Sequence, residues 1–356
     1  MPRTSILIFI AALIAAPIVS AQTDEDIYRA ACATCHGMDG RGAPPEALAF
    51  EAAYPADLTD CNFATREPDK DWLSVAHEGG PARAFAREMP AFGVALDRAQ
   101  LQQAIDYARG FCTDRAWPRG ELNFPRPYGT EKAFPEDEVV ISTSSADGAV
   151  SNKLIYEQRF GARSQFEVIV PFAWRESPGA WGGGIGDVAL GIKHVAFHNL
   201  RRGSIFSVAG EVKLPTGSER RGFGSGNVAI EPFVSFGQRL PANSFLHVQT
   251  GAEIPLDGDA PNEGFLRLAG GKMFIPRAFG RTWTPMIELL GAAELESPQN
   301  IHWDAVPQIQ ISLSRRQHLL ACVGVRTPLN DRSTTDSQFV MYLLWDWFDG
   351  GLTDGW

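Results

Sequence analysis

The chain has 356 residues, long enough for two or three ordinary domains, and its formal net charge of -10 argues against nucleic acid or an anionic membrane surface as a partner. Its hydrophobic pattern has a helical period in the first third and a period of two in the rest. The sequence therefore predicts a multidomain chain, all-α first and all-β afterwards.

The first 21 residues are typical of an export signal. Arg3 supplies a positive start, an apolar run extends from Ile6 to Val19, and Val19-Ser20-Ala21 has the small side chains of a cleavage site. The alternative is an uncleaved anchor helix, but the run is shorter than the roughly 20 residues that a bilayer requires. We therefore predict a signal peptide over residues 1–21 and a protein that acts outside the cytoplasm.

Helix boundary signals occur at both ends of residues 22–113. Thr23 can cap a helix that begins with three acidic residues. Asp97, with Gln100 three residues later, forms a capping box for a second helix. Apolar residues follow it at helical spacing: Leu101, Ile105, Ala108 and Phe111. These signals predict a small all-α domain.

Cys32-Ala33-Thr34-Cys35-His36 is a C-x-x-C-H haem-attachment signature. The two thiols add to the two vinyl groups of the haem, and His36 then lies under the iron as an axial ligand. The alternatives are a redox C-x-x-C, which lacks its βαβ context, and half of a zinc site, which lacks a second Cys/His pair at a suitable spacing. We predict one covalent haem c.

The second axial ligand decides the redox chemistry. Met89 precedes Pro90 on a turn-like stretch, and a thioether there raises the reduction potential and blocks the iron from small ligands. His77 is the rival, since bis-histidine ligation gives a lower potential. Met38 is too close to His36 to reach the opposite face of the haem. We predict Met89, with His77 as the alternative.

Three cysteines remain outside the motif. Cys61 and Cys112 form either a disulfide, which export allows, or two buried thiols, and the sequence leaves both open. Cys322 stands alone and is predicted to be a small packing residue.

Residues 114–137 carry four prolines and many charges. Such a run has little helix or strand, and we predict a stiff, extended linker between the two domains.

From Glu138 onward, apolar and polar residues alternate, which predicts β-strands. Val212 and Leu214, for example, fall on one face of a strand, and Glu211 and Lys213 on the other. Twelve such segments are long enough to cross a bilayer as tilted strands. Their starts lie near Glu138, Ala149, Ser164, Ile185, Arg202, Asn227, Asn243, Asn262, Thr282, Ile301, Gln317 and Ser337.

The connections alternate in length. Those after the fourth, sixth, eighth and tenth segments are short, such as residues 277–280, whereas those after the odd-numbered segments are mostly longer and rich in glycine, such as residues 177–184. Asp147-Gly148, a tight turn, is the exception. With aromatic residues near the strand ends, this asymmetry favours an antiparallel outer-membrane barrel over residues 138–356. The alternative is a soluble sandwich or lipocalin-like barrel, whose charges would face outward.

Two glycine clusters, residues 182–186 and 222–226, do not lie between a buried strand and a helix, so we predict flexible loops and no nucleotide site.

Inward-facing charges of a barrel either select solutes or pair and close the pore. We favour closure, because a lumen of this size is narrow and unpaired buried charges are costly. The charges in question are Asp187, Lys193, Glu211, Lys213, Glu231, Glu253, Arg267 and Glu288.

Residues 22–113 resemble a small class I cytochrome c, on a capped helix, the C-x-x-C-H motif, a Met-Pro loop and a final helix containing Tyr107. The resemblance implies that Cys32 and Cys35 carry the haem and that His36 and Met89 are its axial ligands.

Residues 138–356 resemble outer-membrane barrels of the phenol-degradation transporter type, on the segments 186–191, 210–217 and 345–351. The whole plan is similar to that of the fused cytochrome–porins of iron-oxidising bacteria, which is an analogy of architecture alone.

These resemblances imply an electron carrier of the outer membrane and no enzyme, although oxidation of a metal ion is left open. The haem domain is expected in the periplasm or in the barrel lumen. The expected partners are periplasmic redox proteins, membrane lipid, and an extracellular metal ion or organic solute, with no nucleic acid. The alternatives are a transporter for a small organic solute with the haem domain as a sensor or docking module, and a simple membrane anchor for a cytochrome.

Overall fold

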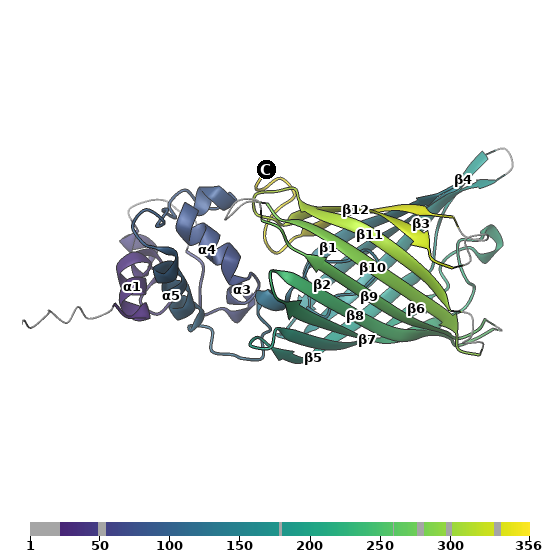
Figure 1. Cartoon of the computed structure of the whole chain (residues 1–356), viewed down its shortest axis with the longest axis horizontal. Coiled ribbons are helices and arrows are strands. Elements are labelled where there is room, and N and C mark those ends of the chain that lie inside the picture. The colour runs from purple at the N-terminus through teal and green to yellow at the C-terminus, as the bar shows by residue number, and fades with distance from the viewer. Residues whose placement is uncertain are drawn as a thin grey trace, which may run out of the picture.

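The computed structural model describes residues 22–48, 55–177, 180–258, 260–275, 281–296, 301–330 and 336–356. A helical domain lies at one end and an antiparallel β-barrel at the other, and the C-terminus lies beside the end of the barrel that faces the helical domain (Figure 1). The predicted signal peptide and the predicted turn at 277–280 lie outside the described residues. Within them, no helix is both long and apolar enough to cross a bilayer.

Both predicted helix starts in the helical domain are confirmed. Thr23 and Asp26 form a capping box, as do Asp97 and Gln100. The first and last helices pack against each other, with the rings of Tyr28 and Tyr107 5.1 Å apart. The elements are α1 (Asp24–Ala31), α2 (Ala33–His36), η1 (Pro45–Ala47), α3 (Cys61–Ala64), α4 (Asp69–Glu78), η2 (Gly80–Arg83), α5 (Arg98–Arg109) and η3 (Gly120–Leu122).

The described chain from Glu138 onward contains one sheet of 13 strands and a short 3-10 helix, η4 (Glu219–Arg221). Its strands are β1 (Glu138–Ala146), β2 (Ala149–Phe160), β3 (Ser164–Ser177), β4 (Ala180–Ile185), β5 (Val188–Asn199), β6 (Ser204–Leu214), β7 (Ala229–Leu240), β8 (Ser244–Pro255), β9 (Glu263–Lys272), β10 (Trp283–Glu294), β11 (His302–Ser312), β12 (Leu319–Pro328) and β13 (Gln338–Asp346). Because β1 pairs with both β2 and β13, every strand except β4 belongs to a closed antiparallel ring of 12 strands.

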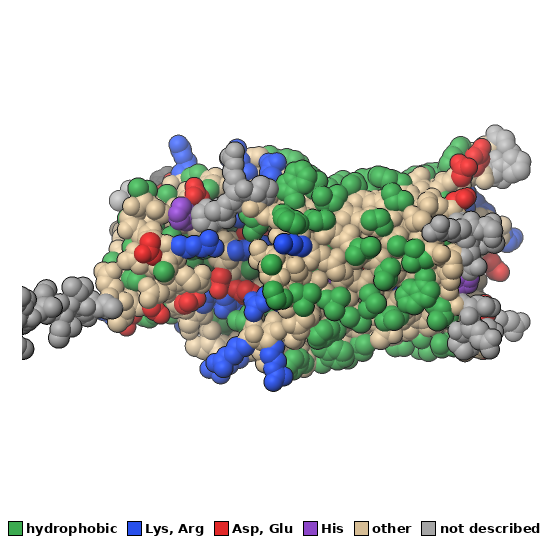
Figure 2. Space-filling view, in the orientation of Figure 1, with side chains coloured by type: hydrophobic (Ala, Val, Ile, Leu, Met, Phe, Trp, Pro, Cys, Tyr) green, Lys and Arg blue, Asp and Glu red, His purple; other side chains and the backbone are tan. Residues whose placement is uncertain are grey.

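The faces of the barrel are oriented as in a membrane protein. On β5, Leu190 and Ile192 are 47% and 59% exposed on the outer face, whereas the next residue, Lys193, is only 5% exposed and lies on the inner face. On β7, Glu231 and Ser235 are likewise buried on the inner side. Figure 2 shows apolar side chains covering the outer wall of the barrel. This arrangement excludes the soluble alternative, in which charges would face outward.

One connection differs from its prediction. The long loop expected over residues 177–184 is instead a hairpin, because β4 pairs with the end of β3. The fourth predicted segment, expected to start near Ile185, is β5 and begins at Val188. The hairpin extends beyond the rest of the barrel (Figure 1). Gly183 permits the pairing, since a Cβ there would lie 2.9 Å from the ring of Trp174. The tight turn at Gly148, with φ 68°, is confirmed.

Candidate functional site

The C-x-x-C-H motif lies at the junction of α1 and α2. Cys32 accepts hydrogen bonds from the backbone N–H groups of Cys35 and His36, at 3.2 and 2.9 Å. This single helical turn brings the two cysteines, three residues apart, to one face. Both thiols are free and half-buried. Tyr28 fixes the end of the turn, since its hydroxyl donates to the Gly37 carbonyl at 2.9 Å.

His36 carries the strongest sign of a missing partner. Its Nδ1 is buried and has no hydrogen-bond partner among the described residues. Burial also lowers the pKa of His36, so the ring is held neutral with a lone pair to offer. Burial raises the pKa of the neighbouring Cys32 thiol to about 11. A free pair of thiols beside a neutral imidazole whose Nδ1 has no partner fits covalent haem c.

Met89 lies on a loop that folds back onto the end of α4. Its carbonyl accepts from the Gly80 N–H at 3.0 Å, and a Cβ added at Gly80 would lie 2.2 Å from the Ala86 carbonyl oxygen. Only glycine permits this close approach. The loop is therefore held in place by backbone contacts, and the Met89 side chain is half-buried on it.

His77 lies in the last turn of α4, next to the loop that carries Met89. Its Nδ1 is 2.8 Å from a carboxylate oxygen of Glu78, and its ring lies over Gly93, where a Cβ would be 2.6 Å away. The Gly93 N–H donates to the His77 carbonyl at 3.0 Å. The ring is thus already engaged by its immediate neighbours.

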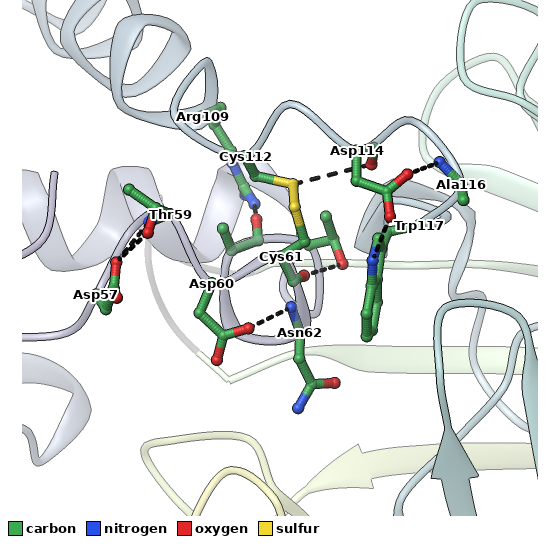
Figure 3. Close-up of a disulfide and its surroundings, with 12 residues drawn as sticks. Asp57, Thr59, Asp60, Cys61, Asn62, Arg109, Cys112, Asp114, Ala116 and Trp117 are labelled. Atoms are coloured by element: carbon green, nitrogen blue, oxygen red, sulfur yellow. Dashed lines mark hydrogen bonds between the residues drawn. A yellow bond between two sulfur atoms is a disulfide. The ribbon is translucent and has the colours of Figure 1, made fainter. Parts of the chain in front are cut away.

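A disulfide closes the helical domain (Figure 3). Cys61, at the start of α3, is bonded to Cys112, just after α5, with Cα atoms 5.1 Å apart. The sequence left this pairing open. Beside it, the buried Arg109 donates to the Ala64 carbonyl, and Asp114 accepts from the Trp117 ring N–H at 3.1 Å. The chain therefore leaves the helical domain from a fixed point.

After this point the chain enters the barrel. Residues 122–137, which we call the luminal segment, contact side chains from strands all round the ring, which places the segment inside it. The Tyr128 N–H donates to Gln308 on β11 at 3.0 Å, and the Glu131 N–H to Gln249 on β8 at 2.9 Å. On the other side, Lys193 on β5 donates to the Lys132 carbonyl at 2.9 Å.

The luminal segment also carries its own buried charges. Arg126 pairs with Glu131 at 2.9 Å, with Glu138 at 2.5 Å and with Glu157 at 2.7 Å. All of these side chains are at least four-fifths buried.

Sequence reasoning missed this role of residues 114–137. The one available signal was the presence of large apolar residues, Leu122 and Phe134 among them, in a stretch predicted to be a stiff, extended linker.

Most of the predicted lumen charges are paired. Lys213 lies 2.6 Å from Glu231 and 2.5 Å from Glu253. Glu288 accepts from the Gly129 N–H at 3.0 Å. Arg267 donates to the Gly129 carbonyl, and Glu211 is buried in the wall. Asp187 is different: it accepts from Gly217 and Ser225 and so orders the β6–β7 loop at the far end of the barrel.

The helical domain is fixed to the barrel by side chains of the short turns. Arg316, between β11 and β12, donates to the Ala84 carbonyl at 2.6 Å. Arg83 donates in the opposite direction, to the Arg315 carbonyl at 3.3 Å, and pairs with Asp71 at 2.8 Å. Gln317 donates to the same Asp71 carboxylate at 3.1 Å. The two parts therefore share an interface beyond the covalent connection.

Residues 20–107 match the family described as cytochrome C oxidase, cbb3-type, subunit III. No curated protein matches the chain. Solved structures similar to the barrel include a KdgM porin (10% identity, TM-score 0.41, covering 58% of this chain and 98% of that one), a NanC porin (10%, 0.39, 58% and 97%) and the COG4313 outer membrane channel from Pseudomonas putida F1 (12%, 0.42, 62% and 99%). The family match and the strand pairings together show a cytochrome c-type domain followed by a closed 12-strand barrel.

Proposed function

We propose that this protein is a monohaem c-type cytochrome of the outer membrane, which passes single electrons between periplasmic carriers and a donor or acceptor on the extracellular side. The observation that carries the proposal is the placement of the C-x-x-C-H motif in a helical domain that is bonded to one mouth of the barrel. A free cytochrome would need no such interface.

The barrel wall supports the membrane location. Its outer face is apolar, and aromatic side chains near the strand ends are exposed on it. They include Trp174, Phe197 and Trp283. Aromatic girdles around an apolar band are typical of outer-membrane barrels. The helical domain lies at the end with the short turns, which in such barrels is the periplasmic end.

In the proposed haem site, Cys32 and Cys35 hold the haem, and His36 and Met89 hold its iron. The haem, when bound, supplies a single-electron couple. The chain sets the surroundings: Tyr28 fixes the turn that carries His36, and burial keeps the imidazole neutral. We favour Met89 over His77, because the loop that carries Met89 is held by backbone contacts at Gly80 and can present the thioether sulfur to the iron.

The alternative of a solute transporter with a haem sensor receives less support. Transport would require the luminal segment to leave the barrel, which would break its contacts with Glu288, Gln249 and Lys193. The luminal segment crosses the lumen and is hydrogen-bonded to the wall. This favours a barrel that positions a redox domain over a barrel that conducts solutes.

The proposal can be tested in proteoliposomes of the purified holoprotein. A membrane-impermeant reductant is added outside, and oxidised cytochrome c is enclosed inside. We expect the enclosed cytochrome to be reduced through the protein. Reduction no faster than in liposomes that contain a Cys32→Ala/Cys35→Ala variant, which has no attached haem, would refute the electron-transfer proposal.

A further inference from the structure

Three carboxylates meet inside the barrel, at one side of the luminal segment. Glu157 on β2 and Glu167 on β3 are directly opposite each other in the strand register, and Glu131 of the luminal segment approaches them from the lumen. One oxygen from each lies within 4.8 Å of the others. Like charges directly opposite each other on paired strands are destabilising unless something neutralises them.

The available cations do not neutralise this cluster. Arg126 pairs with Glu131 and Glu157, and it is shared with Glu138. Lys193 approaches Glu131 only to 3.8 Å. Neither cation has an ion pair with Glu167. More negative than positive charge therefore remains at this place.

Glu167 is the unsatisfied member. It is only 7% exposed, and its Oε2 is buried with no hydrogen-bond partner among the described residues. A buried, charged carboxylate without a partner is strongly unfavourable. The same side chain borders a cavity of about 10 Å³, together with three carboxylates or amides and one ammonium group, those of Glu131, Gln165, Glu211 and Lys193. This is room for about one water-sized particle.

We propose that the carboxylate cluster beside this cavity binds a hard divalent cation, held by oxygens of Glu167 and Glu131, which line the cavity, and of Glu157 next to them. Oxygen-only ligand sets favour Ca²⁺, Mg²⁺ or Mn²⁺ over thiol- or imidazole-seeking metals. Oxygens up to 4.8 Å apart can share one ion at the roughly 2.4 Å typical of Ca²⁺–O distances. Because Glu131 belongs to the luminal segment and the other two to the wall, the ion cross-links the segment to the barrel.

The test uses the purified full-length holoprotein in detergent, stripped with EDTA and titrated with Mn²⁺, whose free form is followed by its EPR signal. We expect wild type to bind about one Mn²⁺ per chain tightly, in competition with Ca²⁺. Glu167→Gln, which is nearly isosteric, should lose this binding. Glu253→Gln, at a carboxylate that pairs with Lys213 elsewhere in the lumen, should keep it.

Glu131→Gln provides a second variant from the luminal segment, and the heat-modifiable mobility of the barrel on gels checks that each variant is folded. Mn²⁺ should also raise the thermal unfolding temperature of wild type and leave that of Glu167→Gln unchanged. Wild type without tight Mn²⁺ binding, or equal binding by folded Glu167→Gln and Glu131→Gln, would overturn the proposal and leave a protonated Glu167 as the explanation.

Discussion

Glu288, in the middle of β10, accepts a hydrogen bond from the hydroxyl of Thr130 at 2.6 Å, although the two residues are 158 positions apart. The same carboxylate accepts from the Gly129 N–H and from Gln308. Because the Glu288 side chain is fully buried, these three donors satisfy a charge that would otherwise be costly. The luminal segment is thus anchored to the barrel wall at β10.

Removal of this anchor should loosen the luminal segment. Glu288→Ala leaves three buried donors without an acceptor, and we expect a loss of about 2–5 kcal/mol in the free energy of unfolding. In planar lipid bilayers, wild type should show low conductance and Glu288→Ala a conductance several-fold higher. Glu288→Gln, which keeps an acceptor for Thr130, is the matched control. Equal conductance of wild type and a folded Glu288→Ala barrel would contradict the closed lumen.

Replacement of the proposed second axial ligand should change the haem but not its attachment. Met89→Leu removes the thioether, so we expect a lower reduction potential and binding of carbon monoxide to the ferrous iron. Potentiometric titration and the carbon monoxide difference spectrum measure both. His77→Ala should leave them unchanged. The opposite pattern, with His77→Ala opening the iron, would assign the ligand to His77.

Loss of the disulfide should destabilise the helical domain. The Cys61–Cys112 bond closes a loop of 51 residues, which corresponds to roughly 4 kcal/mol in the chain-entropy account. Cys61→Ser should lower the denaturant midpoint of the helical circular-dichroism signal, and the double variant with Cys112→Ser should show a similar shift. A midpoint that matches wild type in both variants would mean that the bond does not stabilise the domain.

The interface between the two parts can be weakened at one side chain. Arg316→Ala removes the hydrogen bond to the Ala84 carbonyl and the contact of the guanidinium with the Phe85 ring, 4.6 Å from its centroid. We expect faster limited proteolysis at the exposed stretch around Arg115. Arg202→Ala, on another exposed turn, should behave as wild type. Equal cleavage of wild type and Arg316→Ala would show that the contact does not hold the domain.

The parts of this structure that local patterns encode could be predicted from the sequence. The capping boxes at Thr23 and Asp97 depend on residues three positions apart. The strands depend on the alternation of apolar and polar residues along the chain. The C-x-x-C-H motif is equally local. The second axial ligand is not, because it depends on how a loop folds back, and Met89 stays a prediction.

The luminal segment could not be predicted in this way. Its prolines prevent a regular helix or strand, so its sequence shows no hydrophobic period. Its backbone N–H groups donate to wall side chains more than a hundred positions away, such as Glu131 to Gln249 and Tyr128 to Gln308. The carboxylate cluster at Glu167 is equally hidden, since it depends on both the strand register and the position of that segment. The hairpin at β4 was missed because its glycines suggested a loop.

The most direct test of the central claim is reduction of the haem in intact cells by a membrane-impermeant donor, followed by its absorption spectrum. The account predicts that the haem is reduced from outside, and that Arg316→Ala slows this reduction while the haem content stays constant. A haem that is reduced only after the outer membrane is opened, or only when periplasmic carriers are added, would contradict electron transfer across the outer membrane by this protein.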